Sequence, residues 1–173
     1  MTHVIRSDAQ ANRARVVLAA RSVFAEQGLA ADMKTIAQQA NVGVGTIYRN
    51  FATKDELLQA VMEACIADAY RDLLDLRAVH EGRERLAALA RTAFLHAERN
   101  GPLFAAIGAA GTPPSIDPPP EILEIITAIF SEAAADGDLR ADIPAAFLAR
   151  FLATLFPAYL ELRQSFPAEL VTG

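Results

Sequence analysis

The stretch NVGVGTIYRNFATKDEL, residues 41–57, decides the fold because its two glycines, Gly43 and Gly45, precede an aromatic and basic cluster. Glycines of this kind occur in phosphate-binding loops, but a dinucleotide-binding loop follows a strand, and a Walker loop ends in Gly-Lys-Ser/Thr. This stretch has neither feature, since the residues before it have the pattern of a helix. It therefore predicts a short turn between two helices, the arrangement that places a recognition helix in the major groove of DNA.

Two amphipathic segments precede the turn. Over residues 12–27 the apolar residues recur at steps of three and four, and Gly28 follows as a left-handed stop. Asp32 stands where an N-cap belongs, ahead of the short segment MKTIAQQA. A supporting helix and a second, short helix are therefore expected before the turn.

Two further helices are expected after the turn. Residues 44–51 form a third short helix with Ile47 and Phe51 turned inward. Thr53 and Glu56 have the spacing of a capping box, which starts a fourth, long helix in KDELLQAVMEACIADAYRDLLDL. This long helix is expected to connect an amino-terminal head to a helical body.

The remaining sequence predicts only helices, with no credible strand pair. One helix should stop near Asn100 and Gly101, Pro102 should start a short one, and the proline-rich loop Thr112–Pro120 should follow. Further helices are expected at residues 121–135 and 144–163, with Gly137 ending the first, Asp142 capping the second and Pro157 bending or breaking it. The predicted fold class is all-α.

The charges are divided unevenly along the chain, whose formal net charge is -5. Through Glu56 there are seven Lys/Arg and five Asp/Glu residues, whereas the remainder has nine against sixteen. A basic head on an acidic body favours nucleic-acid binding by the head. The single Cys65, the lack of a secretory signal and the charge and prolines within Ile143–Leu160 predict a cytoplasmic protein without a membrane span.

The third helix carries side chains suited to DNA. Gly45 lets the backbone approach the duplex, Val44 offers methyl groups to a thymine edge, and Lys54 adds a cation at the next helix start. The other hydrogen-bonding side chains of this face are those of Thr46, Tyr48, Arg49 and Asn50. Phosphate contacts are expected from Tyr48 and Lys54, and base contacts from Thr46, Val44 and Asn50.

At these residues the chain resembles the TetR-type (TetR/AcrR) one-component transcriptional regulators. The resemblance rests on VVLAARSVFAEQG, IAQQANVGVGTIYRNF and TKDELLQAV, in that order, and more loosely on AAADGDLRADIPAAFLARFL. It implies a DNA-binding domain over residues 1–52, with the helix-turn-helix at about 32–51, and an effector-binding and dimerisation domain over 53–173. By position, the DNA-contacting places fall to Lys34, Thr35, Val44, Gly45, Thr46, Tyr48 and Lys54. Gly43 stands where the family usually has a serine cap, and Asn41 where it usually has glycine.

The family resemblance also implies a ligand-released repressor that binds a palindromic operator in double-stranded DNA. The effector, unidentified and expected to be apolar, would lie in the body near Phe94, His96, Phe104, Ile107 and Phe130. Because two-fold operators call for a two-fold protein, a homodimer is expected. Its interface should use apolar residues of the last two helices, Ile122, Ile126, Ile129, Phe147, Phe151, Leu155 and Tyr159.

Other functions have weaker support in the sequence. The histidines show no metal-ligand spacing and no nucleophile elbow is present, so no enzyme activity, metal or cofactor is expected. The aspartates from Asp136 resemble a calcium loop, but Phe147 occupies the twelfth place, where glutamate belongs. The main alternative is a non-enzymatic helical protein-interaction module whose basic head binds an acidic partner.

Overall fold

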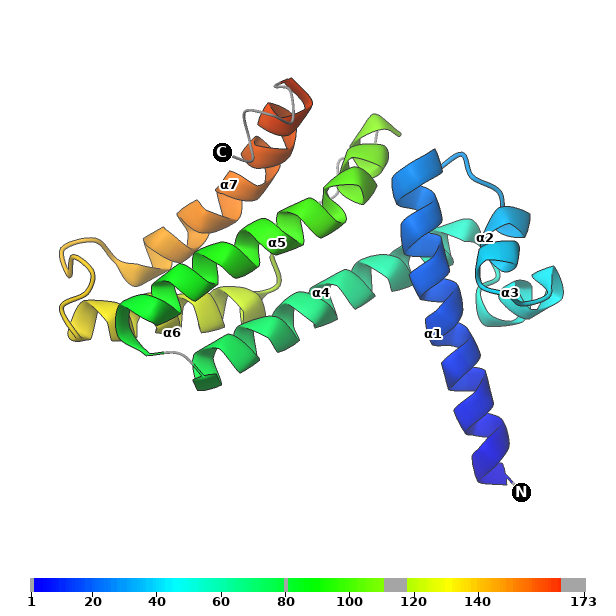
Figure 1. Ribbon diagram of the computed structural model, residues 1–173, viewed down its shortest axis with the longest axis horizontal. Coiled ribbons are helices and arrows are strands. Elements are labelled where there is room, and N and C mark those ends of the chain that lie inside the picture. Colours follow the sequence, from blue (N-terminus) through cyan, green and yellow to red (C-terminus); the bar gives the residue numbers. More distant parts are fainter. Residues whose placement is uncertain (1, 80, 111–117, 166–173) are drawn as a thin grey trace. The chain divides into compact units, whose positions relative to one another are not determined.

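The computed structural model describes residues 2–79, 81–110 and 118–165, with side chains placed for residues 10–78, 81–110 and 118–155. The described residues form helices and no strands, which confirms the all-α prediction (Figure 1). The helices are α1 (Thr2–Gln27), α2 (Met33–Gln39), α3 (Val44–Asn50), α4 (Lys54–Val79), α5 (Gly82–Ala109), α6 (Pro120–Ala135) and α7 (Ala145–Ser165). No helix among them is long and apolar enough to span a membrane.

The chain divides into two compact units. The first comprises Met1–Cys65 with Pro102–Pro114, and the second comprises Ile66–Gly101 with Ser115–Gly173. Both α4 and α5 are therefore shared, each contributing one part to each unit. The expected boundary at residue 52 marks the start of α4, whereas the first compact unit continues to Cys65 and includes the end of α5.

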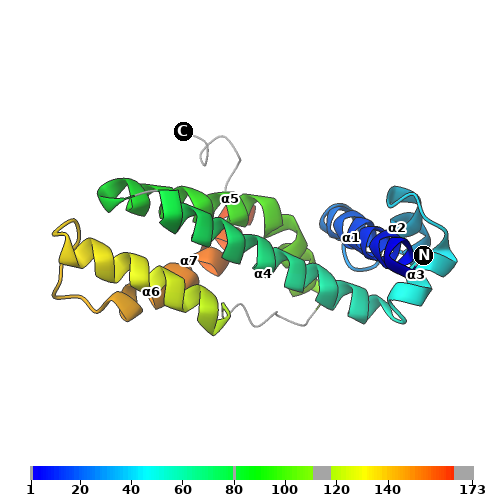
Figure 2. The same cartoon turned by 90° about the horizontal axis from the view of Figure 1, so that it is seen from below.

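In the first unit, α2 and α3 lie on the same side of α1 (Figures 1 and 2). Val16, Ala20, Val23 and Phe24 of α1 are buried at the spacing expected for one helix face. The helix begins ten residues earlier than its apolar pattern, at Thr2, and ends before Gly28, which has a φ of 76°. This left-handed turn is the stop that the sequence predicts.

The end of α5 completes the core of the first unit. Leu103 and Ile107 are buried in the same cluster as the inward residues of α1, α2 and α3, and Phe104 packs against it. The predicted interruption at Asn100 and Gly101 is wrong, because α5 continues through Pro102. The clash that usually keeps the residue before proline out of a helix involves its Cβ atom, which Gly101 lacks.

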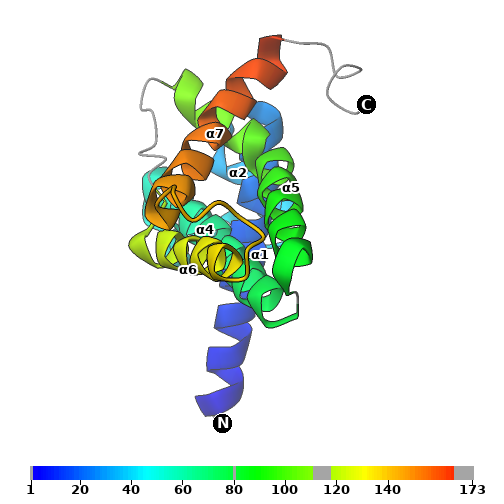
Figure 3. The same cartoon turned by 90° about the vertical axis from the view of Figure 1, so that its left-hand side faces the viewer.

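In the second unit, α6 and α7 pack against each other, and α5 lies on the opposite side of the unit from α6 (Figures 2 and 3). Their shared core includes Leu73 and Leu76 of α4, Leu89 of α5, and residues of α6 and α7, among them the four named next. Those four are Ile122, Ile126, Ile129 and Ala149. This unit thus has its own apolar core, separate from that of the first.

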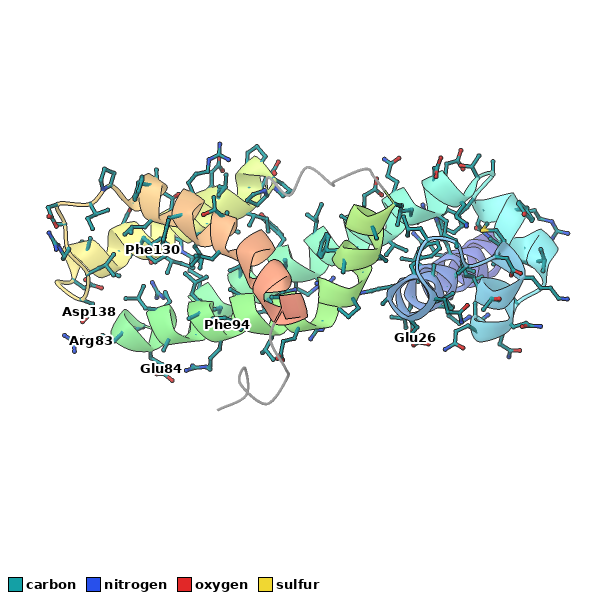
Figure 4. The ribbon with its side chains drawn as sticks, turned by 90° about the horizontal axis from the view of Figure 1, so that it is seen from above. Glu26, Arg83, Glu84, Phe94, Phe130 and Asp138 are labelled. Carbon is teal, nitrogen blue, oxygen red and sulfur yellow. The ribbon has the colours of Figure 1, made fainter. Side chains whose placement is uncertain are left out.

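Ion pairs join the helices of the second unit at one end. The Glu132 carboxylate of α6 accepts hydrogen bonds from Arg77 of α4, at 2.5 Å, and from Arg85 of α5. Arg83 of α5 pairs with Asp138 at 2.8 Å (Figure 4). These contacts join α6 to α4 and α5, and α5 to the segment that follows α6.

The segment between α6 and α7 differs in part from the sequence prediction. Gly137 ends α6 with a φ of 79°, as expected. Asp142, however, does not cap α7, because its carboxylate binds the Arg140 guanidinium and the helix begins only at Ala145. Nor does Pro157 break α7, which continues to Ser165. The expected proline-rich loop lies mostly outside the described residues.

Candidate nucleic-acid interface

The turn between α2 and α3 is closed by backbone hydrogen bonds of the Schellman type. The Val42 N–H donates to the Ala37 carbonyl at 3.0 Å, and the Asn41 N–H donates to the Gln38 carbonyl at 3.1 Å. Asn41 has a φ of 53°, a left-handed conformation that asparagine tolerates better than other non-glycine residues. Asparagine therefore occupies the left-handed position of this turn, at which glycine is more usual.

The α3 helix has one inward side chain. Ile47 is fully buried, and Phe51, at the C-cap, is 2% exposed. Elsewhere on the helix Tyr48 is 53% exposed, and Val44, Gly45 and Arg49 are also exposed. The helix therefore presents these four residues assigned to DNA to solvent, and the predicted apolar residues Ile47 and Phe51 to the core.

The start of α3 is unblocked. Gly43 is its N-cap and supplies no side-chain hydrogen bond, although its carbonyl accepts from the Thr46 N–H at 2.8 Å. Apart from its chain neighbours and the backbone of its own helix, a Cβ atom added at Gly45 would have no heavy atom of the described protein within 4 Å. The backbone at Gly45 is thus open to a molecule approaching from outside.

Two of the predicted base-reading residues are half-buried. The Asn50 side-chain amide donates to the Thr46 carbonyl at 2.8 Å, which leaves Asn50 a second amide hydrogen and its side-chain oxygen for other partners. Thr46 has its side chain partly covered. Both lie on α3 within one turn of the exposed Tyr48.

The α2 helix begins at the predicted cap. The Asp32 carboxylate accepts a 2.7 Å hydrogen bond from the Thr35 N–H, and this bond lowers the pKa of the Asp32 carboxyl below its usual value. Lys34 is exposed beside it and Thr35 is half-buried. The first turn of α2, which this cap fixes, therefore carries Lys34 and Thr35, the two α2 residues that the family resemblance assigns to DNA.

The capping box at the start of α4 is confirmed for the Thr53 side chain, whereas Glu56 binds the N–H of the residue before Thr53. The Thr53 hydroxyl accepts from the Glu56 N–H at 3.1 Å, and the Glu56 carboxylate accepts from the Ala52 N–H at 2.8 Å. Lys54 is half-buried, and its ammonium donates to the Leu29 carbonyl at 2.6 Å. A lysine expected to contact only phosphate thus also has a partner within the protein.

The expected effector residues fall into both units. Phe104 and Ile107 belong to the core of the first unit, whereas Phe130 packs against the core of the second. Phe94, on α5, is 59% exposed (Figure 4). His96 is mostly buried in the second unit, where its Nε2 atom lies 2.8 Å from Asp72 Oδ2.

The expected dimer residues also separate. Ile122, Ile126 and Ile129 of α6 are buried in the chain's own core, so they offer almost no surface to a second copy. Phe147, Phe151 and Leu155 instead form an exposed stripe along α7, at intervals of four residues. The side chain of Tyr159 lies outside the described residues. Of the residues expected at the interface whose side chains are described, only those of α7 are exposed in the single chain.

Sequence reasoning missed several residues whose partners are distant in the chain. Arg13 of α1 lies over the ring of Phe51, and Asp72 of α4 binds His96 of α5. No local pattern announces such pairs, because only the tertiary fold brings the two residues together. Among the described side chains, no group of three or more His, Cys, Asp or Glu residues is placed to hold a metal ion.

Comparisons with known proteins agree with this geometry. A sequence profile described as "Bacterial regulatory proteins, tetR family" matches residues 16–61, from the core of α1 into α4. The HTH-type transcriptional regulator UidR of Escherichia coli (strain K12) is 35% identical over 79 residues, which are 45% of this chain and 39% of UidR. The matched part thus spans well under two thirds of that relative.

Two solved structures resemble the chain over most of its length. The TetR transcriptional regulator SCO0520 from Streptomyces coelicolor is 32% identical, with a TM-score of 0.63 covering 84% of this chain and 85% of that one. A gamma-butyrolactone receptor (ArpA-like protein) is 28% identical, with a TM-score of 0.60 covering 83% and 77%. With its exposed helix-turn-helix and this extended similarity, the chain belongs to the TetR family of bacterial transcriptional regulators.

Proposed function

We propose that this protein is a ligand-released transcriptional repressor that binds a palindromic operator as a homodimer. The observation that carries the DNA-binding part is the two-sided α3 helix, on which Ile47 is buried while Tyr48 projects into solvent. A short exposed helix after a closed turn has the size and shape to enter a major groove. Residues 1–52 form the DNA-binding domain in this proposal, and residues 53–173 the effector-binding and dimerisation domain.

The side chains of α3 divide by chemistry. Val44 and Thr46, at the start of the helix, offer methyl and hydroxyl groups to base edges, and the amide oxygen of Asn50 accepts from a base. Tyr48, with Arg49 and the remaining donors of Lys54, binds phosphate oxygens and fixes the register on the duplex. On α2, Lys34 and Thr35 add contacts to the backbone of the DNA.

The exposed stripe on α7 supports the homodimer. The rings of Phe147 and Phe151 stack at a centroid distance of 6.4 Å, and Leu155 extends the same face by one turn. Large apolar side chains aligned on one helix face are costly to leave in water, so they mark a surface that a partner covers. In this proposal the partner is α7 of a second copy.

The effector site rests on His96. A carboxylate only accepts hydrogen bonds, so Nε2 of His96 carries the proton that points to Asp72. In the neutral ring Nδ1 is then an acceptor, and it is buried without a hydrogen-bond partner among the described residues. An apolar effector with a hydroxyl or N–H group would supply the missing donor. The similarity to a structure named as a receptor for gamma-butyrolactone supports a ligand-responsive body.

Release from DNA follows if the effector binds more tightly to the conformation with low operator affinity. A shift from mostly bound to mostly free requires a difference in effector affinity of about 10⁴, or about 5.5 kcal/mol, between the two states. The α4 helix, which begins in the DNA-binding head and carries Asp72, is the element that would transmit the change.

Selection of bound duplexes from a random pool tests the proposal. A repressor of this kind enriches a palindrome whose half-sites are about one helical turn, roughly 34 Å, apart. If the selected duplexes shared no sequence, the assignment of a specific operator would be wrong, and the protein-interaction module would be favoured. With the palindrome in hand, a panel of apolar alcohols, phenols and lactams identifies effectors as compounds that abolish the gel shift in wild type but not in His96→Leu.

A further inference from the structure

The Lys54 ammonium makes a contact that DNA binding alone does not require. It donates to the backbone carbonyl of Leu29 at 2.6 Å, across 25 residues of sequence and in a partly buried position. Leu29 lies in the turn between α1 and α2, and its side chain packs against the core of the first unit. A carbonyl in such a turn has no helical partner, so Lys54 provides one.

The same contact fixes the start of α4. Lys54 is the first residue of this helix, and Leu57, three residues later, is fully buried. The side chains of Thr53 and Glu56 make the capping hydrogen bonds at the same helix start. The first turn of α4 is therefore held by local capping bonds, by a buried leucine and by one charged bond to the α1–α2 turn.

The chemistry of the ammonium allows two roles at once. Lysine has three N–H donors, of which the Leu29 carbonyl takes one. A bond from a charged donor is roughly twice as strong as a neutral one. The remaining donors of the ammonium can bind phosphate oxygens while the bond to Leu29 is kept.

We propose that Lys54 is a positioning residue, which locks the first turn of α4 onto the α1–α2 turn before DNA arrives. The conformational entropy of the Lys54 side chain is then lost when the protein folds. DNA binding does not have to offset this loss, so the affinity for DNA is higher. The effect on DNA affinity rests on the proposed function, whereas the effect on the free protein does not.

Three variants separate this role from a plain phosphate contact. Lys54→Met keeps most of the apolar stem but removes the charge and the donors, and Lys54→Arg keeps both. Lys34→Met is the matched control, because Lys34 is exposed on the first turn of α2 and carries the same charge. Each variant is measured without DNA, by thermal unfolding and amide hydrogen exchange, and with DNA, by affinity as a function of salt.

Lys54→Met is expected to lower the thermal midpoint of the free protein by roughly 3–6 °C and to speed amide exchange at residues 28–31 and 54–57. Its operator affinity falls at least about tenfold, while Lys54→Arg keeps the midpoint within about 2 °C of wild type. Lys34→Met lowers the salt slope by about one and leaves the midpoint unchanged.

The proposal is overturned if Lys54→Met leaves the midpoint and the exchange rates unchanged and alters only the salt slope. It is also overturned if Lys34→Met lowers the midpoint equally. In both cases the assignment of the head to DNA still stands. That assignment fails separately, if neither lysine variant nor any substitution on α3 changes DNA binding.

Discussion

The guanidinium carbon of Arg13 lies 4.6 Å from the centroid of the Phe51 ring. The contact joins α1 to the C-cap of α3, so it helps hold the candidate recognition helix on the head. A cation over an aromatic face contributes about 0.5–1 kcal/mol at an exposed site. Arg13→Met should therefore reduce the free energy of unfolding in urea by about that amount. Arg13→Lys, which keeps the charge, should lose less, and an Arg13→Met protein as stable as wild type would contradict the assignment.

Gly45→Ala should change stability and DNA binding in opposite directions. Alanine is better than glycine inside a helix by about 0.5–1 kcal/mol, and the new methyl group meets no described atom within 4 Å beyond its chain neighbours and its own helix backbone, so the free protein becomes more stable. The same methyl group obstructs a close approach of DNA to the start of α3, so operator affinity falls. Gly108→Ala, at an equally open position on α5, is the control for stability without an effect on DNA. Unaltered operator affinity in Gly45→Ala would show that DNA does not approach the backbone there.

Tyr48→Phe and Thr46→Val should affect DNA binding in different ways. Tyr48→Phe removes one hydrogen bond from an uncharged hydroxyl to a DNA phosphate. We therefore expect the affinities for operator and random duplexes to fall by the same factor, about tenfold. Thr46→Val removes a hydroxyl assigned to a base and should relax preference at one position by about 1–3 kcal/mol. Competition binding with single-position operator variants measures both effects. If the two proteins lost discrimination equally, the division between phosphate and base contacts would be wrong.

Phe151→Ser should convert the homodimer into a monomer. Phe151 is 54% exposed in the single chain, in the middle of the α7 stripe, so its replacement disrupts the proposed interface with little effect on the core. Leu95→Ser is the matched control, since Leu95 is 58% exposed on α5. Light scattering at micromolar concentration should give half the wild-type mass for the first variant only. A wild-type protein that is itself monomeric would refute the dimer.

The cap at Asp32 should make stability depend on pH. Because its pKa is lowered in the folded protein by the hydrogen bond from Thr35, the contribution of the ionised carboxylate is fully present above the unfolded pKa, near 4. It is lost as the pH falls through the lower, folded pKa. Unfolding of wild type and Asp32→Asn between about pH 2.5 and 6 measures this, because asparagine caps without titrating. The difference in the free energy of unfolding between the two proteins should shrink on acidification. A difference that stays constant would show that the pKa of the Asp32 carboxyl is the same in the folded and unfolded states.

The sequence was a reliable guide where a structural feature depends on neighbouring residues. The Asp32 cap, the Thr53 and Glu56 capping box and the stop at Gly28 each involve residues no more than four apart, so their patterns could be recognised directly. The inward positions of Ile47 and Phe51 followed from helical periodicity. These features determine most of the helix-turn-helix.

Features that depend on distant residues were not predictable in the same way. The isoleucines of α6 are apolar whether they face their own core or a second copy, and only packing against α4, α5 and α7 decides between the two. Likewise, Lys54 and His96 have partners 25 and 24 residues away, and nothing in the local sequence marks those partners. The interruption expected at Pro102 failed because the proline rule ignores the missing Cβ of the glycine before it.

The single inward residue of α3 has a consequence for how such regulators diversify. Since Ile47 is the one fully buried residue within α3, the exposed positions of this helix are under little constraint from folding. After a gene duplication, exchanges at these positions could redirect one copy to new promoters while both copies kept the same interior. If α3 reads the operator as proposed, selection can therefore change the DNA target of this protein without loss of its fold.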